Sequence, residues 1–336
     1  MKNPLVLIVV LLGVLSGSVA SAHEVRPAYL EITQRESGSY SILWKRPTMG
    51  EVAVHLVPHL SNGWLDREPA SQYVAQGFLI RTWSIEARDA AVLAGSTLII
   101  EGLEYTMTDV FLRIRLLDGY DANAVLRPGK PSFAVTAEHA GHFAVPAYLG
   151  LGVEHILSGP DHLLFVLGLL LLVRNRWMLF RTVSAFTVAH SITLTATVLG
   201  ALRVPVPFVE ALIALSILFL ALEVLRAQRG DSSVAIRHPW AAAFAFGLFH
   251  GMGFASGLSA LGFEQHELFA ILALFNIGVE VGQLCFIAVA LLVAYGLQRI
   301  NLARRPHAAA IPAYVIGIAG AYWTFQCSAA WIGAQS

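Results

Sequence analysis

Residues 146–173 form the apolar stretch PAYLGLGVEHILSGPDHLLFVLGLLLLV, whose centre carries the ionisable segment Glu154-His155-Ile156-Leu157-Ser158-Gly159-Pro160-Asp161-His162. A helix rises about 1.5 Å per residue, so this stretch is long enough to cross a hydrocarbon core of about 30 Å. Ionisable groups inside a bilayer are costly unless they are paired, and by default they indicate a functional site. The stretch therefore predicts a membrane span that carries such a site.

Gly159-Pro160 lies between the two histidines of this segment. Proline lacks a backbone N–H and interrupts a helix, which also frees a carbonyl group. His155 and His162 are seven residues apart, or two helical turns, and so belong to one face. Broken helices at the membrane midplane are a common way to build ion sites in transporters. We predict a broken helix that presents both histidines to the same site.

Five further apolar stretches follow, at 178–200, 205–226, 239–260, 268–296 and 309–333. The segments after the first, third and fifth stretches are rich in arginine, whereas the segments between hold only Arg203. This alternation is what the positive-inside rule demands of six transmembrane helices whose preceding domain lies outside. It predicts a multi-pass protein of the bacterial inner (cytoplasmic) membrane, with the C-terminus on the periplasmic side.

Polar side chains also lie near the centre of three other stretches, namely His190 with Ser191 and Thr193, then His250, and then Asn276, Glu280 and Gln283. The last three residues follow i, i+4, i+7 spacing, which places them on one stripe of a helix. We expect His155, Asp161, His162, His190 and His250 to converge on one metal site, with Glu280 in or beside its coordination sphere. Ser191, Thr193, Asn276 and Gln283 are expected to be supporting polar groups. Glycines at 247, 251, 253, 278 and 282 are expected to let helix backbones approach closely.

The residue types indicate a cation. Hydrogen bonds between helices would explain Ser, Thr and Asn, but they do not require carboxylates. Asp161 and Glu280 with neutral imidazoles give a charge near −2, which a divalent ion would neutralise. Imidazole combined with carboxylate suits Ni²⁺, Co²⁺ or Zn²⁺. We therefore predict a divalent metal ion at the bilayer midplane.

The first 144 residues differ in character. Lys2, the apolar run 5–15 and Ala20-Ser21-Ala22 form a signal peptide at 1–22, so that cleavage makes His23 the N-terminus. Residues 23–144 show period-2 runs at 29–33, 40–45, 52–57, 78–85, 97–100 and 110–116, and Ser37-Gly38-Ser39 suggests a hairpin turn. About seven short strands indicate an all-β, sandwich-like extracytoplasmic domain. Residues 145–336 are then an all-α polytopic bundle of about six transmembrane helices.

Composition excludes several classes of function. Charged residues make up 13% of the 336-residue chain, against roughly 25% in soluble domains, and no lysine follows Lys130. The formal net charge is zero, so nothing suggests nucleic-acid binding. The sequence has no phosphate-binding loop of the G-x-x-x-x-G-K-[ST] type and therefore no recognisable ATP-binding motor. The only cysteines, Cys285 and Cys327, lie in apolar runs, which disfavours a thiolate metal site.

Three outer histidines suggest metal capture. His139 and His142 are three residues apart just before the first span. The cleaved N-terminus would give His23 a free α-amine beside its imidazole. We hypothesise that these groups capture metal and pass it inward, although a solvated linker and an ordinary N-terminus explain them equally well.

In these motifs the chain resembles the HupE/UreJ family of bacterial membrane proteins, in its longer branch with an N-terminal extracytoplasmic domain. The matching stretches are 155–165, 189–194, 246–254 and 276–283, and 22–27 resembles that branch's mature start. The resemblance implies a nickel or cobalt permease or metal-delivery protein linked to hydrogenase or urease maturation, and thus a periplasmic or maturation partner of unknown identity.

Three functions compete. The preferred one is a divalent-metal secondary transporter, driven by proton exchange at histidine and carboxylate ligands. The second is an intramembrane zinc-dependent hydrolase, in which three histidines hold an ion that activates water. The third is a membrane metal sensor or chaperone. A permease should have a polar path on both sides of its site, whereas a hydrolase should have a closed site with a lipid-facing cleft.

Overall fold

The computed structural model describes residues 27–48, 56–75, 77–86, 93–106, 108–136, 145–259, 265–299 and 310–333. It divides into two compact units, a β unit within Val25–Ala147 and a helical unit from Tyr148 onward. The outer groups His23, His139 and His142 and the signal peptide lie outside the described residues.

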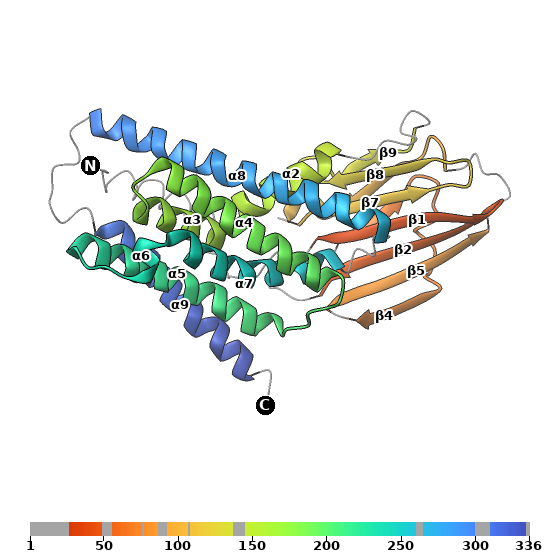
Figure 1. The fold of residues 1–336 in the computed structure, drawn as a ribbon. Helices are drawn as coiled ribbons and strands as arrows, with labels where there is room; N and C mark the ends of the chain where they lie inside the picture. Colours follow the sequence, from red (N-terminus) through yellow and green to blue (C-terminus); the bar gives the residue numbers. More distant parts are fainter. Residues whose placement is uncertain are drawn as a thin grey trace. The chain divides into compact units, whose positions relative to one another are not determined.

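The β unit contains two sheets (Figure 1). The larger has the strand order β4-β5-β2-β1-β7-β8, and the smaller has the order β3-β6-β9. The strands are β1 (Ala28–Glu36), β2 (Ser39–Pro47), β3 (Val57–Leu60), β4 (Ser71–Ala75), β5 (Phe78–Glu86), β6 (Thr97–Glu101), β7 (Val110–Arg115), β8 (Asp121–Leu126) and β9 (Ser132–Ala134), with a 3₁₀ turn, η2, at Leu103–Tyr105. Neighbouring strands are antiparallel except β1 and β7, which pair in parallel with Leu30 opposite Leu112.

Alternation explains how the strands form the core. In β2 every second residue, Tyr40, Ile42 and Trp44, is buried, as expected of a strand with one face inward. These side chains share one hydrophobic cluster with Leu60 and Leu98 of the smaller sheet. The predicted hairpin is confirmed, because β1 and β2 pair antiparallel across the turn. The predicted strands at 78–85, 97–100 and 110–116 correspond to β5, β6 and β7, and most of the predicted strand at 52–57 lies outside the described residues.

His59 joins three parts of the β unit. Its Nδ1 lies 3.0 Å from the carboxylate of Asp66, and its Nε2 lies 2.9 Å from the carboxylate of Glu101 on β6. The bond to Asp66 is the largest cause that raises the pKa of His59 above 6.5, and Glu101 adds to it, whereas burial opposes both. When it is protonated, the His59 ring can donate to both carboxylates and so link β3 to β6 and to the segment after β3.

This linkage predicts a pH-dependent local stability. A raised folded-state pKa means that the stabilisation is fully present below the unfolded pKa and is lost as pH rises through the folded pKa. Hydrogen exchange of β3 and β6 in the full chain should be faster in His59→Gln than in the unmodified protein at about pH 5.5. The difference should disappear at about pH 9, where both side chains are neutral. An equal difference at both pH values would contradict a charged link.

The helical unit consists of α2 (Val145–Ser158), α3 (Pro160–Leu172), α4 (Arg176–Val198), α5 (Val206–Arg229), α6 (Val234–Arg237), α7 (Pro239–Ser259), α8 (Gln265–Arg299) and α9 (Ile311–Gly333) (Figure 1). Local signals fix several ends. The Asn175 side chain accepts hydrogen bonds from the N–H groups of Trp177 and Met178 and thereby caps α4. Gly230 ends α5 in the left-handed conformation, at φ 87°.

Fewer spans are evident than the six predicted. Within the described residues, two helices are long and apolar enough to cross a membrane, Val206–Arg229 and Leu268–Gly296. A third span results if the bent pair Tyr148–Ser158 and Pro160–Leu172 is counted as one. α4 is not among them, and its Ser, Thr and His side chains lower its hydropathy. The helical part thus has two to three apolar helices that suit a membrane.

Close backbone contacts between helices occur at the expected glycines. A Cβ atom added at Gly247 or Gly251 of α7 would lie 2.5 Å or 2.2 Å from a carbonyl oxygen of α4. At Gly278 of α8 it would lie 2.2 Å from the Leu149 carbonyl oxygen of α2. These distances are far below van der Waals contact, so no side chain fits. The prediction of close approach is confirmed at these three positions and at Gly282, where a Cβ would lie 3.2 Å from backbone atoms of Val153 in α2. Gly253 meets only side-chain atoms, the nearest at 3.2 Å.

Candidate metal centre

The predicted break in the first span is confirmed. α2 ends at Ser158, α3 begins at Pro160, and the two axes differ by 75°. Pro160 occupies the first turn of α3, where its missing N–H costs no hydrogen bond. A Cβ on Gly159 would lie 2.6 Å from Nδ1 of His162 and 3.0 Å from Oδ1 of Asp161. The absence of a side chain at the break thus leaves room for the functional groups that follow it.

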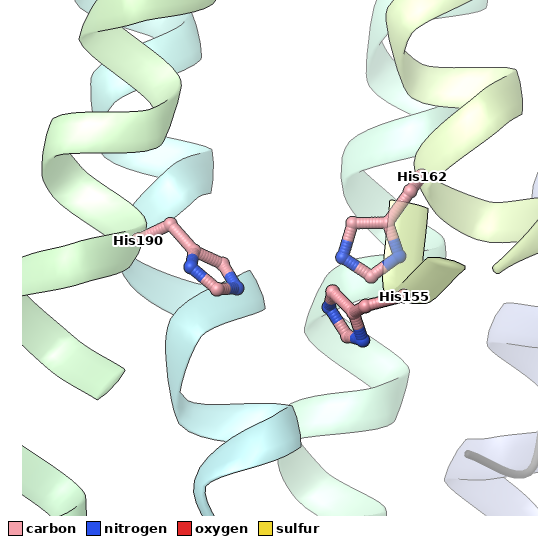
Figure 2. A group of neighbouring side chains, drawn as sticks. All are labelled: His155, His162 and His190. Carbon is pink, nitrogen blue, oxygen red and sulfur yellow. The ribbon is translucent and has the colours of Figure 1, made fainter. Parts of the chain in front are cut away.

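The break places His155, at the end of α2, against His162, in the first turn of α3. Their ring centroids are 4.6 Å apart, in an edge-on arrangement. His190 of α4 faces both rings, with centroids 5.9 Å and 6.4 Å away, and Figure 2 shows the three rings turned toward one another. One ligand atom from each of the three lies within 4.8 Å of the others, so they form a first candidate metal-binding group.

A second candidate group shares a member with the first. It consists of Asp161, His162 and His250, again with ligand atoms within 4.8 Å of one another. Oδ1 of Asp161 lies 3.1 Å from Nδ1 of His162. The His162 and His250 ring centroids are 5.0 Å apart. Residues from α2, α3, α4 and α7 thus meet around His162, which is 5% exposed.

Aromatic rings surround the imidazoles. Phe254 lies 4.2 Å from the His155 ring, centroid to centroid, and stacks on Phe275 at 5.0 Å. Phe186 lies 5.1 Å from His250 and 6.1 Å from His190. Such walls exclude water, which strengthens electrostatic interactions inside.

Each of the four histidines has a buried ring nitrogen without a hydrogen-bond partner in the described part of the chain. These atoms are Nε2 of His155, His162 and His190, and Nδ1 of His250. Buried polar atoms are nearly always hydrogen-bonded, and an exception requires an explanation such as an unplaced ion. Four such exceptions in one cluster fit a metal ion, because an imidazole binds metal through its unprotonated nitrogen.

Neighbouring side chains determine which nitrogen is unprotonated. Asn276 donates from its amide nitrogen to the Leu272 carbonyl, at 2.7 Å, so its oxygen faces Nδ1 of His190 at 3.4 Å. An amide oxygen only accepts, so Nδ1 must carry the hydrogen and Nε2 the lone pair. In His162 the carboxylate of Asp161 likewise accepts from Nδ1, which leaves the lone pair on Nε2.

His250 is oriented through a serine. The Ser216 hydroxyl donates to the Ile213 carbonyl at 2.6 Å, so its oxygen is left to accept from Nε2 of His250, at 3.3 Å. The lone pair of His250 is therefore on Nδ1, the nitrogen without a partner. In all three cases the outer hydrogen bond leaves the metal-binding nitrogen unprotonated, which is the usual role of outer partners in metal sites.

Asn276 should therefore influence metal affinity without touching the metal. Asn276→Leu should weaken Co²⁺ binding by about 10–100-fold, the usual cost of losing an outer partner. Asn276→Asp should retain tight binding, since a carboxylate also accepts from Nδ1 of His190. Titration of the purified full chain with Co²⁺ measures both. Equal losses in the two variants would show that Asn276 matters only for packing.

The other predicted polar residues form hydrogen bonds with groups outside the two candidate metal-binding groups. Glu280 accepts a hydrogen bond from Ser184 at 2.6 Å, and Gln283 accepts one from Thr187 at 3.0 Å. Glu280 belongs to neither candidate group within the described residues. The hydroxyls of Ser191 and Thr193 donate to backbone carbonyls of α4, at 2.7 Å and 3.2 Å.

Ser184, Thr187 and Ser216 were not among the residues predicted from the sequence. Thr187 precedes His190 by three residues and Ser184 precedes Thr187 by three, and these steps of three, each between neighbours on the helix surface, were a usable signal. Ser216 had no such signal, because its histidine partner is 34 residues away in sequence on another helix.

Comparison with known proteins agrees with these motifs. A family model described as HupE / UreJ protein matches residues 132–327, which extends from β9 to α9 and includes every residue of both candidate groups. No curated protein and no solved structure matches the chain. Because the match covers more than half of the 336 residues, and because it agrees with the resemblance seen in the motifs, the chain belongs to the HupE/UreJ family.

Proposed function

We propose that this protein is a secondary transporter of a divalent transition-metal ion of the Ni²⁺ or Co²⁺ type. The observation that carries the proposal is the convergence of four histidines, each with a buried ring nitrogen that has no partner among the described residues, beside the carboxylate of Asp161. Imidazole with carboxylate suits Ni²⁺, Co²⁺ and Zn²⁺ rather than Mg²⁺ or Ca²⁺. The association of the HupE/UreJ family with nickel and cobalt transport favours the first two.

A metal ion is a better explanation of the cluster than interhelical hydrogen bonds. Unpartnered buried nitrogens cost free energy, about 1–3 kcal/mol each. Histidines that served only to join helices would bond to one another or to backbone groups. Within the described part of the chain, Asp161, Asn276 and Ser216 bond the outer nitrogens of His162, His190 and His250 and leave the inner nitrogens open. The arrangement suits a cation that enters and leaves.

A polar row between α4 and α8 favours a transporter over an intramembrane hydrolase. The pairs Thr187–Gln283 and Ser184–Glu280 continue from His190 along the helix. Ser184 is six residues from His190, or about 9 Å along α4. This row is one of the two polar paths that a permease requires, and a closed hydrolytic site would not need it. This row leads toward Arg176 and Arg181, on the side that the arginine pattern assigns to the cytoplasm.

The membrane arrangement is part of the same proposal. The helical unit crosses the inner membrane six times, with the β unit and the C-terminus on the periplasmic side. The arginine alternation and the signal peptide support this arrangement independently of each other. His23, His139 and His142 would then lie on the side from which metal arrives, where they and the β unit would collect it or meet a partner.

Uptake by the purified full chain in liposomes tests the proposal. Ni²⁺ or Co²⁺ should accumulate inside protein-containing vesicles over time and should not accumulate in protein-free vesicles. Metal that binds to the protein without accumulating would reject the transporter and leave the hydrolase or sensor. Zn²⁺ in a parallel assay establishes which ion is preferred.

A further inference from the structure

The histidine cluster contains two groups of ligands rather than one. The first offers three imidazoles, and the second offers two imidazoles and a carboxylate. Within the described residues, neither His155 nor His190 joins a group with His250. The Phe186 ring lies near both His190 and His250, at centroid distances of 6.1 Å and 5.1 Å.

His162 is the only residue common to both groups. Its Nδ1 lies beside Asp161, and its Nε2 has no partner in the described part of the chain. A neutral imidazole has a single lone pair and can bind one ion at a time. The two groups therefore compete for one ligand.

We propose that the cluster provides two adjacent metal positions that share His162, are filled alternately, and hand the ion from one to the other. The proposal rests on the proposed transport function and gives that site its mechanism. In the first position the ion is held by His155, His162 and His190. In the second it keeps His162 and exchanges the other two ligands for Asp161 and His250.

Sharing one ligand has a clear physical advantage. A bare divalent ion among aromatic side chains would lose its solvation, which is very costly in a medium of low dielectric constant. An ion that keeps His162 while it exchanges the other ligands is never without one. To bind the ion in the second position, the Asp161 carboxylate must leave Nδ1 of His162, because Nδ1 and Nε2 point to opposite sides of the ring and one carboxylate cannot reach both.

The chemical difference between the positions makes the proposal testable. Three nitrogen ligands and two nitrogens with one oxygen give distinct Co²⁺ absorption spectra. The purified full chain should bind one Co²⁺ at saturation. His190→Ala should bind one Co²⁺ through the second group, and His250→Ala should bind one through the first. The two variants should have different spectra, and both should lose uptake because the ion can no longer be handed on.

Controls separate this proposal from simple failure to fold and from failure of the transport function. His238→Ala removes an exposed histidine between α6 and α7 and should behave like the unmodified protein. Retained Co²⁺ binding in each single variant is itself evidence of folding, and His190→Gln and His250→Gln provide less disruptive versions. The double variant should bind no Co²⁺.

Three outcomes would overturn the shared pair of positions. They are two Co²⁺ per unmodified chain, complete loss of binding in either glutamine variant, or identical spectra in the two single variants. If the unmodified chain binds and transports metal in these cases, the proposed function stands and only the shared arrangement fails. If the unmodified chain neither binds nor transports metal, the proposed function itself is wrong.

Discussion

Replacement of His162 by alanine should abolish both metal binding and uptake. Every other member of the cluster belongs to one candidate group, whereas His162 belongs to both. Loss of an outer partner alone commonly weakens metal binding by about 10–100-fold, so loss of a shared ligand should weaken it by more than about 100-fold. Uptake in liposomes should fall to the protein-free background at every metal concentration.

Thermal unfolding distinguishes this loss from misfolding. A ligand present at about 100 times its dissociation constant stabilises the folded state by about 2.7 kcal/mol, so metal should raise the unfolding temperature of the unmodified protein. His162→Ala should lose that shift. Without metal it should unfold at a somewhat lower temperature than the unmodified protein, because it also loses the bond between Nδ1 of His162 and Asp161, so the diagnostic quantity is the shift caused by metal. His238→Ala should keep the shift, and a shift retained in His162→Ala would contradict the central role of His162.

Local sequence signals were sufficient for several features. The Gly159-Pro160 break could be predicted because proline acts within one turn of helix. The hairpin between β1 and β2 could be predicted because its turn is short and contains Gly38, which adopts a φ of 80°. In each case the physical cause lies within a few residues along the chain.

Features that depend on contacts across the chain could not be predicted in the same way. β4 was missed because four of its five residues are exposed and it shows no buried alternation, as befits a strand at the edge of its sheet. The parallel pairing of β1 with β7 joins residues about 80 positions apart. Neither feature leaves a periodic signal in the local sequence.

The candidate site also combines features that local sequence predicts with features that depend on how the helices pack. The depth of His155, His162, His190 and His250 in their apolar stretches followed from the sequence. Their division into two groups around His162 depends on how α2, α3, α4 and α7 pack, and no spacing encodes it. Glu280 shares a stripe with Asn276 but is one turn away, and its carboxylate bonds to Ser184. Its role as a ligand stays a prediction.

Gly251→Ala should disrupt the metal site although Gly251 cannot bind metal. A Cβ atom there would lie 2.2 Å from the carbonyl oxygen of His190 and 2.3 Å from Oγ1 of Thr193. The first of these is backbone of α4 and cannot rotate away, so α7 and α4 must separate. Overpacking of this kind costs about 1–3 kcal/mol, and here it would also displace His190 and the adjacent His250.

Two other glycines provide graded controls for that result. Gly253, two residues along α7, would place its Cβ 3.2 Å from the flexible end of Ile213, and Gly296 of α8 would meet nothing within 4 Å. Gly296→Ala should leave Co²⁺ affinity unchanged and should stabilise α8 by up to about 1 kcal/mol, since alanine is the better helix former. Gly253→Ala should have a small effect, and Gly251→Ala should lose most Co²⁺ binding and unfold at a lower temperature. If Gly251→Ala bound Co²⁺ as tightly as Gly296→Ala, the close contact between α4 and α7 would not be what holds the two histidines in place.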